Sequence, residues 1–135
     1  MHEGKGNPGD HTAYADVYAE PDGTVVMRYH TGVALDHAGA VLVAAAHVRA
    51  AAGQPRPILV DVRGLVSVER AARQVAAGAD VVGATSRMAL LVGNPVTRVL
   101  GNFFSRVTTP GYPTRLFTHE AEARAWLKEA PHEPR

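Results

Sequence analysis

The 135-residue sequence contains no cysteine, which excludes disulfide bonds, thiolate catalysis and cysteine-ligated zinc. No apolar run approaches the ~20 residues that cross a bilayer, and residues 1–12 lack the apolar core of a signal peptide. The charges nearly balance, because the chain has 14 basic and 13 acidic side chains. We therefore predict a cytoplasmic protein that binds neither membranes nor nucleic acid.

The sequence signatures of several reaction classes are also missing. The chain has no phosphate-binding GxxxxGK[ST] loop, no GxGxxG after a strand and no GxSxG nucleophile elbow. Its histidines show no HExxH or other metal-ligand spacing. We expect no metal site, no cofactor and no catalytic residue.

The most informative segment that is present is PILVDV at residues 57–62. It is apolar and rich in β-branched residues apart from Asp61, and Pro55 and Gly64 bound it. This pattern is typical of a strand that is buried on both faces, and such strands are covered by helices.

The rest of the chain supplies alternating strands and helices. Strands are predicted at 14–20 and 24–30 around a Pro-Asp-Gly turn, and at 57–62, 87–92 and 113–117; helices are predicted at 37–52, 68–83, 96–107 and 119–130. The resulting order, ββαβαβαβα, predicts an α/β fold with a mixed, mostly parallel sheet flanked by helices. A single domain at 13–130 would lie between a disordered leader, 1–12, and a polar tail, 131–135.

Caps and faces of the helices follow from residue type. The predicted N-caps are Asp36, Ser67, Asn94 and Thr118. Gly78 is expected to end or bend the second helix. In the alanine-rich first helix, Val41, Leu42, Ala44, Ala45 and Val48 recur at helical spacing and are expected to face the sheet, with His47 and Arg49 facing solvent. In the last helix, Ala121, Ala125 and Trp126 or Leu127 are expected to face inward.

Three segments carry a family resemblance: PILVDVRGLVSVERAAR at 57–73, ALLVGNPVTRVLGNFF at 89–104 and TRLFTHEAEARAWL at 114–127. Over residues 14–128 the chain resembles the STAS superfamily, which has the fold of the SpoIIAA-type anti-sigma-factor antagonists. More closely, it resembles single-domain STAS-like proteins of unassigned function. Antagonists of this type carry a Ser or Thr that a partner kinase phosphorylates, and the resemblance places Arg70 at that position and Glu69 before it. Arginine has no hydroxyl, so the resemblance implies the scaffold without the usual switch.

Candidate binding residues come from the predicted carboxyl edge of the sheet, where open α/β sheets bind ligands. They are Asp61, Arg63, Ser67, Asn94, Thr97, Arg98, Asn102 and Tyr112. Asn94, Arg98 and Asn102 recur at i, i+4 and i+8 and so form one stripe along the third helix. Arg63 and Arg98 beside the N-terminus of that helix suggest an anion site, whereas the same stripe also suits a solvated helix face with a cap. A buried Asp61 would suit the role of a general base. The alternative is a carboxylate that accepts hydrogen bonds from the N–H groups of a neighbouring loop or from Arg63. Tyr112, on a Pro-Gly-Tyr-Pro loop, is predicted to be exposed.

Two functions remain open. The first is a non-enzymatic regulatory or protein-binding module that meets a protein partner or a second copy of itself through residues 61–70 and the third helix. The alternative is a binding protein for a small apolar or anionic molecule, or a cofactor-independent enzyme, with a pocket near the third helix. Residues able to line that pocket are Met27, Met88, Phe103, Phe104, Tyr112 and Phe117, although core packing also explains them.

Overall fold

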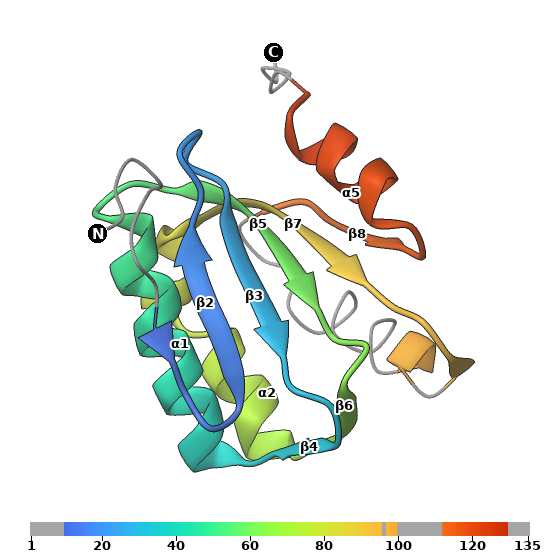
Figure 1. Cartoon of the computed structure of the whole chain (residues 1–135). Helices are drawn as coiled ribbons and strands as arrows, with labels where there is room; N and C mark the ends of the chain where they lie inside the picture. The colour runs from blue at the N-terminus through green and yellow to red at the C-terminus, as the bar shows by residue number, and fades with distance from the viewer. Residues whose placement is uncertain (1–9, 96, 100–111, 130–135) are drawn as a thin grey trace.

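The computed structural model describes residues 10–95, 97–99 and 112–129. Its main feature is a six-stranded sheet in the order β1-β2-β3-β5-β7-β8 (Figure 1). The strands are β1 (Asp10–His11), β2 (Ala15–Ala19), β3 (Val25–Tyr29), β5 (Arg56–Asp61), β7 (Thr85–Leu91) and β8 (Thr114–Phe117). The first two pairings are antiparallel and the last three are parallel. The predicted mixed, mostly parallel sheet is confirmed.

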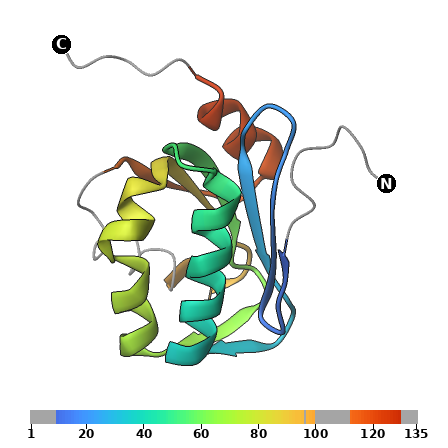
Figure 2. The ribbon, with the colours of Figure 1, turned by 90° about the vertical axis from the view of Figure 1, so that its left-hand side faces the viewer.

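The mid-chain strand β5 lies inside this sheet, between β3 and β7. Successive side chains of a strand point to opposite faces. Ile58 and Val60 accordingly pack into the core beneath α1 (His37–Ala51) and α2 (Arg70–Ala76), whereas Leu59 packs into a second core beneath α5 (Glu120–Leu127). Figure 2 shows α1 and α2 together on one side of the sheet. Helices therefore cover both faces, as the apolar run predicts.

Helix α1 begins where the sequence predicts, because Asp36 Oδ1 accepts a hydrogen bond from Gly39 N at 2.8 Å. The predicted face was wrong. His47 is buried, with 2% exposed, whereas Val41 and Leu42 are 45% and 51% exposed. Small residues dominate the inward face, so it carries no hydropathy contrast that would identify it.

Besides β1, two short strands were not predicted. β4 (Val33–Leu35) and β6 (Leu65–Val68) form a separate two-stranded parallel sheet. Ser67 therefore belongs to a strand and does not cap α2, whose N-cap position is Glu69. The predicted second helix is divided into α2 and α3 (Ala79–Gly83), with Gly78 at the N-cap of α3, so the break expected at Gly78 is confirmed.

Helix α5 packs on the second face through Ala123, Trp126 and Leu127. Its N-cap position is His119, with no side-chain cap bond, so the predicted Thr118 cap was wrong. Ala121 and Ala125 are exposed rather than inward. The Phe117 and Trp126 rings lie 5.7 Å apart and anchor the helix to β8.

The ends of the domain differ in part from the prediction. Asp10 and His11, assigned to the leader, pair with β2. Residues 1–9 of the leader, the tail at 131–135 and most of the predicted third helix lie outside the described residues. Within that helix, Pro95 and residues 97–99 are helical.

Candidate functional site

The parallel strands β3, β5 and β7 end at one edge of the sheet, which we call the carboxyl edge. In Figure 1 their arrowheads point towards β4, β6 and the helical segment that starts at Pro95. The predicted residues Asp61, Arg63, Ser67 and Asn94 all lie on the segments at this edge.

Asp61 and Arg63 form the centre of the site. Asp61 Oδ1 accepts hydrogen bonds from Arg63 N at 3.1 Å and Arg63 Nε at 2.9 Å, and Oδ2 accepts one from Arg63 Nη2 at 2.8 Å. Asp61 is buried, whereas the Arg63 side chain is 49% exposed. The geometry therefore favours the second interpretation of Asp61, in which its carboxylate accepts hydrogen bonds from the following loop and from Arg63.

Sequence reasoning missed four further members of this site: Arg28, Glu120, Arg124 and Glu20. Arg28 in β3 donates from Nη1 to Asp61 Oδ2 at 3.1 Å and to Glu120 Oε1 at 3.1 Å. Glu120 also accepts from Arg124 Nε at 2.9 Å, and Arg124 in turn donates to both carboxylate oxygens of Glu20. The partners come from segments far apart in the chain, so no local pattern reveals them.

The ion pairs set the protonation of the network. Hydrogen bonds from Arg28, and then from Arg124, lower the pKa of Glu120 to about 2. Burial alone would raise the pKa of Asp61, but hydrogen bonds from Arg63 and Arg28 outweigh it and hold the pKa below its ordinary value. Both carboxylates are charged at neutral pH, so Asp61 is not a general base with a raised pKa.

Asn94 and Thr97 have a structural use. Thr97 Oγ1 accepts from Gly93 N at 2.8 Å and Asn94 N at 3.2 Å, while Asn94 Oδ1 accepts from Thr97 N at 2.9 Å. This reciprocal arrangement satisfies the free N–H groups at a helix start. The predicted Asn94 cap is present, and Thr97, with 0% exposed, is part of it.

The outer surface of the carboxyl edge combines arginines with apolar residues. The aliphatic part of Arg63 packs over Gly93, where an added Cβ would lie 3.2 Å from Arg63 Cγ. Ser67 and Arg98 are exposed, and so are Val66 (55%) and Val99 (65%). The stripe predicted on the third helix continues to Asn102, which lies outside the described residues.

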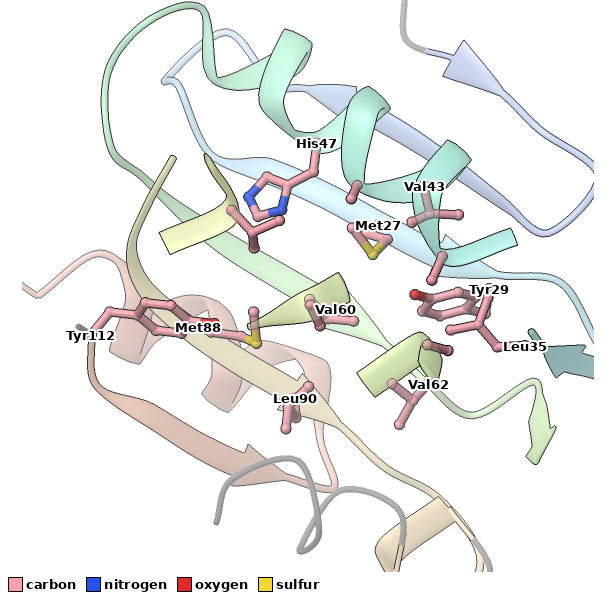
Figure 3. A pocket seen from close by; sticks show the side chains of 15 residues that line it. Met27, Tyr29, Leu35, Val43, His47, Val60, Val62, Met88, Leu90 and Tyr112 are labelled. Atoms are coloured by element: carbon pink, nitrogen blue, oxygen red, sulfur yellow. The ribbon is translucent and has the colours of Figure 1, made fainter. Parts of the chain in front are cut away.

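Tyr112 does not belong to this edge, and the prediction that it is exposed was wrong. It is buried, with 8% exposed, and lines a cavity of about 60 Å³ between the sheet and helices α1, α2 and α3 (Figure 3). Met27 and Met88 line the same cavity, as the pocket hypothesis proposed, whereas Phe117 packs on the opposite face of the sheet. Phe103 and Phe104 lie outside the described residues.

The described part of the chain lacks both a metal-binding cluster and a helix that could span a membrane. It contains no group of three or more histidine or acidic side chains arranged to hold a metal ion. No helix in it has the length and apolar character needed to cross a bilayer.

Comparison with known proteins identifies the family. A family model with the description Domain of unknown function (DUF7793) matches residues 17–131. The chain belongs to the DUF7793 family. No curated protein matches it.

A solved structure places this DUF7793 chain in a fold group. It is similar to the crystal structure of an uncharacterized protein from the DUF3478 family, with a SpoIIAA-like fold, from Shewanella loihica PV-4. The TM-score is 0.61 at 15% identity, over 87% of this chain and 98% of that one. The SpoIIAA-like fold implied by the sequence resemblance is therefore confirmed.

Proposed function

We propose that this protein is a non-enzymatic, protein-binding regulatory module and that the carboxyl edge is its contact surface. The observation that carries the proposal is the pair of exposed valines, Val66 and Val99. They lie on the two segments that meet where Arg63 packs over Gly93. Exposed apolar side chains beside arginine are typical of the centre of a protein interface.

The charges at this edge indicate the kind of partner. Arg63, Arg70 and Arg98 are exposed, and Glu69 is the acidic residue among these neighbours. Asp61 compensates the charge of Arg63 and fixes its geometry through three hydrogen bonds. We infer a different protein that presents acidic groups around an apolar contact, because the same surface on two copies would bring arginines together.

The absence of a hydroxyl at position 70 bears on regulation. Arg70 is exposed at the first position of α2, where the family resemblance puts a phosphorylated Ser or Thr. An arginine there supplies a permanent positive charge. We therefore expect binding that depends on partner abundance and salt rather than on a kinase.

The test places a negative charge at the proposed contact surface. Val66→Glu and Val99→Glu are compared with Val41→Glu, which alters an equally apolar, 45% exposed residue on α1. The full-length protein and each full-length variant are used to capture partners. The captured partner is purified, and its affinity for the protein and for each variant is measured by calorimetry at low and moderate salt. We expect at least a tenfold loss of affinity for the two edge variants, no change for Val41→Glu, and weaker binding at higher salt.

Three results would contradict the proposal. One is a partner whose affinity is unchanged by both edge variants. Another is equal loss in the Val41→Glu control. The third is a dimer in native mass spectrometry that Val66→Glu or Val99→Glu dissociates, because this would make a second copy the occupant of the edge.

A further inference from the structure

The cavity between the sheet and helices α1, α2 and α3 is distinct from the carboxyl edge. Of the described residues, fifteen line it, and none of these is acidic or a lysine or arginine. Its walls include small side chains on the facing helices, Ala40 and Ala44 from α1 and Ala72 and Ala76 from α2. Because alanine fills little volume, the helices leave about 60 Å³ between themselves and the sheet.

Among the described lining residues, His47, Tyr29 and Tyr112 carry polar side-chain atoms. His47 is 2% exposed, and Figure 3 shows its ring directed from α1 towards the cavity. Burial lowers the pKa of His47 to about 4, so the ring is neutral at pH 7.

The hydrogen bonds of Thr85 determine which nitrogen of His47 carries the proton. Thr85 Oγ1 donates to Val81 O at 2.7 Å, so towards His47 Nε2, at 3.4 Å, its oxygen acts as acceptor. The proton of the neutral ring is thus on Nε2, and Nδ1 is an acceptor. Among the described residues, no hydrogen bond reaches Nδ1.

We propose that this cavity binds a small, neutral, mainly apolar molecule that carries one N–H or O–H group, which it donates to Nδ1 of His47. An acceptor in an apolar site is costly to leave unpaired, and a donor on the ligand removes that cost. None of the described lining residues offers a charge to compensate an ionised ligand, which disfavours acids and amines in their charged forms.

The size of the space limits the ligand. A volume of about 60 Å³ is less than half of the ~150 Å³ that accommodates benzene in an engineered apolar cavity. By this comparison about two or three heavy atoms fit without rearrangement, and a five-membered ring fits only if side chains of the wall move. Met27 and Met88 give the walls some adaptability, because methionine is flexible and polarisable.

Pyrrole and furan are the probes that separate the two parts of the proposal. They have nearly the same shape, but only pyrrole carries a donor. The methyl groups of Met27 and Met88 report binding by NMR in the methionine-labelled full chain. We expect saturable shifts of both methyl signals with pyrrole and at least tenfold weaker binding of furan.

Alanine-to-leucine variants supply the matched control. Ala44→Leu fills the cavity, whereas Ala45→Leu makes the same change at the next position of α1, which is exposed. Ala76→Val fills the space from α2 and replaces Ala44→Leu if that variant fails to fold. We expect the filling variants to lose pyrrole binding and Ala45→Leu to keep it.

The ¹⁵N shifts of His47 provide an independent readout, with Nε2 protonated and the Nδ1 signal moving on addition of pyrrole. Absence of saturable methyl shifts would overturn the proposal, and so would binding that survives both filling variants. Equal affinity for pyrrole and furan would overturn the role of Nδ1. These outcomes do not depend on Val66 or Val99, so the cavity and the contact surface stand or fall separately.

Discussion

Arg28 of β3 and Glu120 of α5 form a two-pronged ion pair across 92 positions of the chain, with Nη1–Oε1 at 3.1 Å and Nη2–Oε2 at 2.8 Å. Arg28 also reaches the buried carboxylate of Asp61. One guanidinium in β3 thus joins the end of the neighbouring strand β5 and the first turn of α5.

Replacing Arg28 with lysine should lower the free energy of unfolding by about 1–2 kcal/mol. Lysine keeps the charge but cannot reproduce the planar fork that reaches two carboxylates. Arg49→Lys is the matched control, because Arg49 is 63% exposed and pairs with Asp10 at the surface. Urea unfolding at pH 7 measures both, and an equal loss in the two variants would contradict a special role for Arg28.

Glu120 should remain ionised to unusually low pH. Its pKa of about 2 lies below the ordinary 4.5, so its ionisation stabilises the fold fully above pH 4.5, and this stabilisation is lost as the pH falls through 2. The ¹³C shift of the Glu120 carboxyl should titrate with a midpoint near 2 in the native protein. In an Arg28→Ala variant the midpoint should move up, since its first hydrogen-bond partner is gone, and an unchanged midpoint would refute this assignment.

His47 should make the protein sensitive to mild acid. Its folded pKa of about 4 lies below 6.5, so the unfolded chain takes up the proton first and stability falls as the pH drops from 6.5 towards 4. The shift corresponds to about 3 kcal/mol in total. His47→Gln should flatten this part of the dependence of stability on pH. His37→Gln, at the exposed start of α1, should leave the dependence unchanged. Identical slopes in all three proteins would disprove the prediction.

Gly64 should tolerate no side chain. A Cβ at this position would overlap the carbonyl oxygen of His30. Gly64→Ala should therefore destabilise the protein by about 1–3 kcal/mol. Gly83 in α3 has nothing within 4 Å of its hypothetical Cβ, so Gly83→Ala should be neutral or slightly stabilising by thermal unfolding. The prediction fails if the two substitutions have the same effect.

The Thr97 hydroxyl should contribute to stability through its backbone bonds. Thr97→Val preserves the shape but leaves Gly93 N and Asn94 N without their acceptor, at a cost of about 1–2 kcal/mol. Thr97→Ser retains the oxygen and should lose less. If serine and valine are equally destabilising in urea, packing rather than hydrogen bonding explains the residue.

The sequence predicted the central strand well because burial on two faces leaves a direct signature. Every position from Ile58 to Val60 is apolar, and Pro55 and Gly64 mark the limits. The face of α1 could not be predicted by the same means, since alanine is compatible with either side. His47 looked polar and hence exposed, although its neutral ring is buried beside Thr85.

The candidate site was predicted only where its parts are close in sequence. Asp61 and Arg63 are two residues apart, so their pairing was foreseeable. Arg28 on a strand and Glu120 in the first turn of a helix each fit an ordinary local pattern, and only the tertiary fold brings them together. Ser67 was taken for a cap because β6 is too short to show a periodic pattern.

The position of α5 at the end of the sequence has a consequence for synthesis. Trp126 and Leu127 cover the second face of the sheet, and Glu120 meets Arg28, which the ribosome adds some ninety residues earlier. Until α5 has been synthesised, Leu59 and Leu91 of the nascent chain lack this cover. The domain therefore completes its fold only after α5 has been synthesised, and a chain truncated ahead of α5 is prone to aggregation.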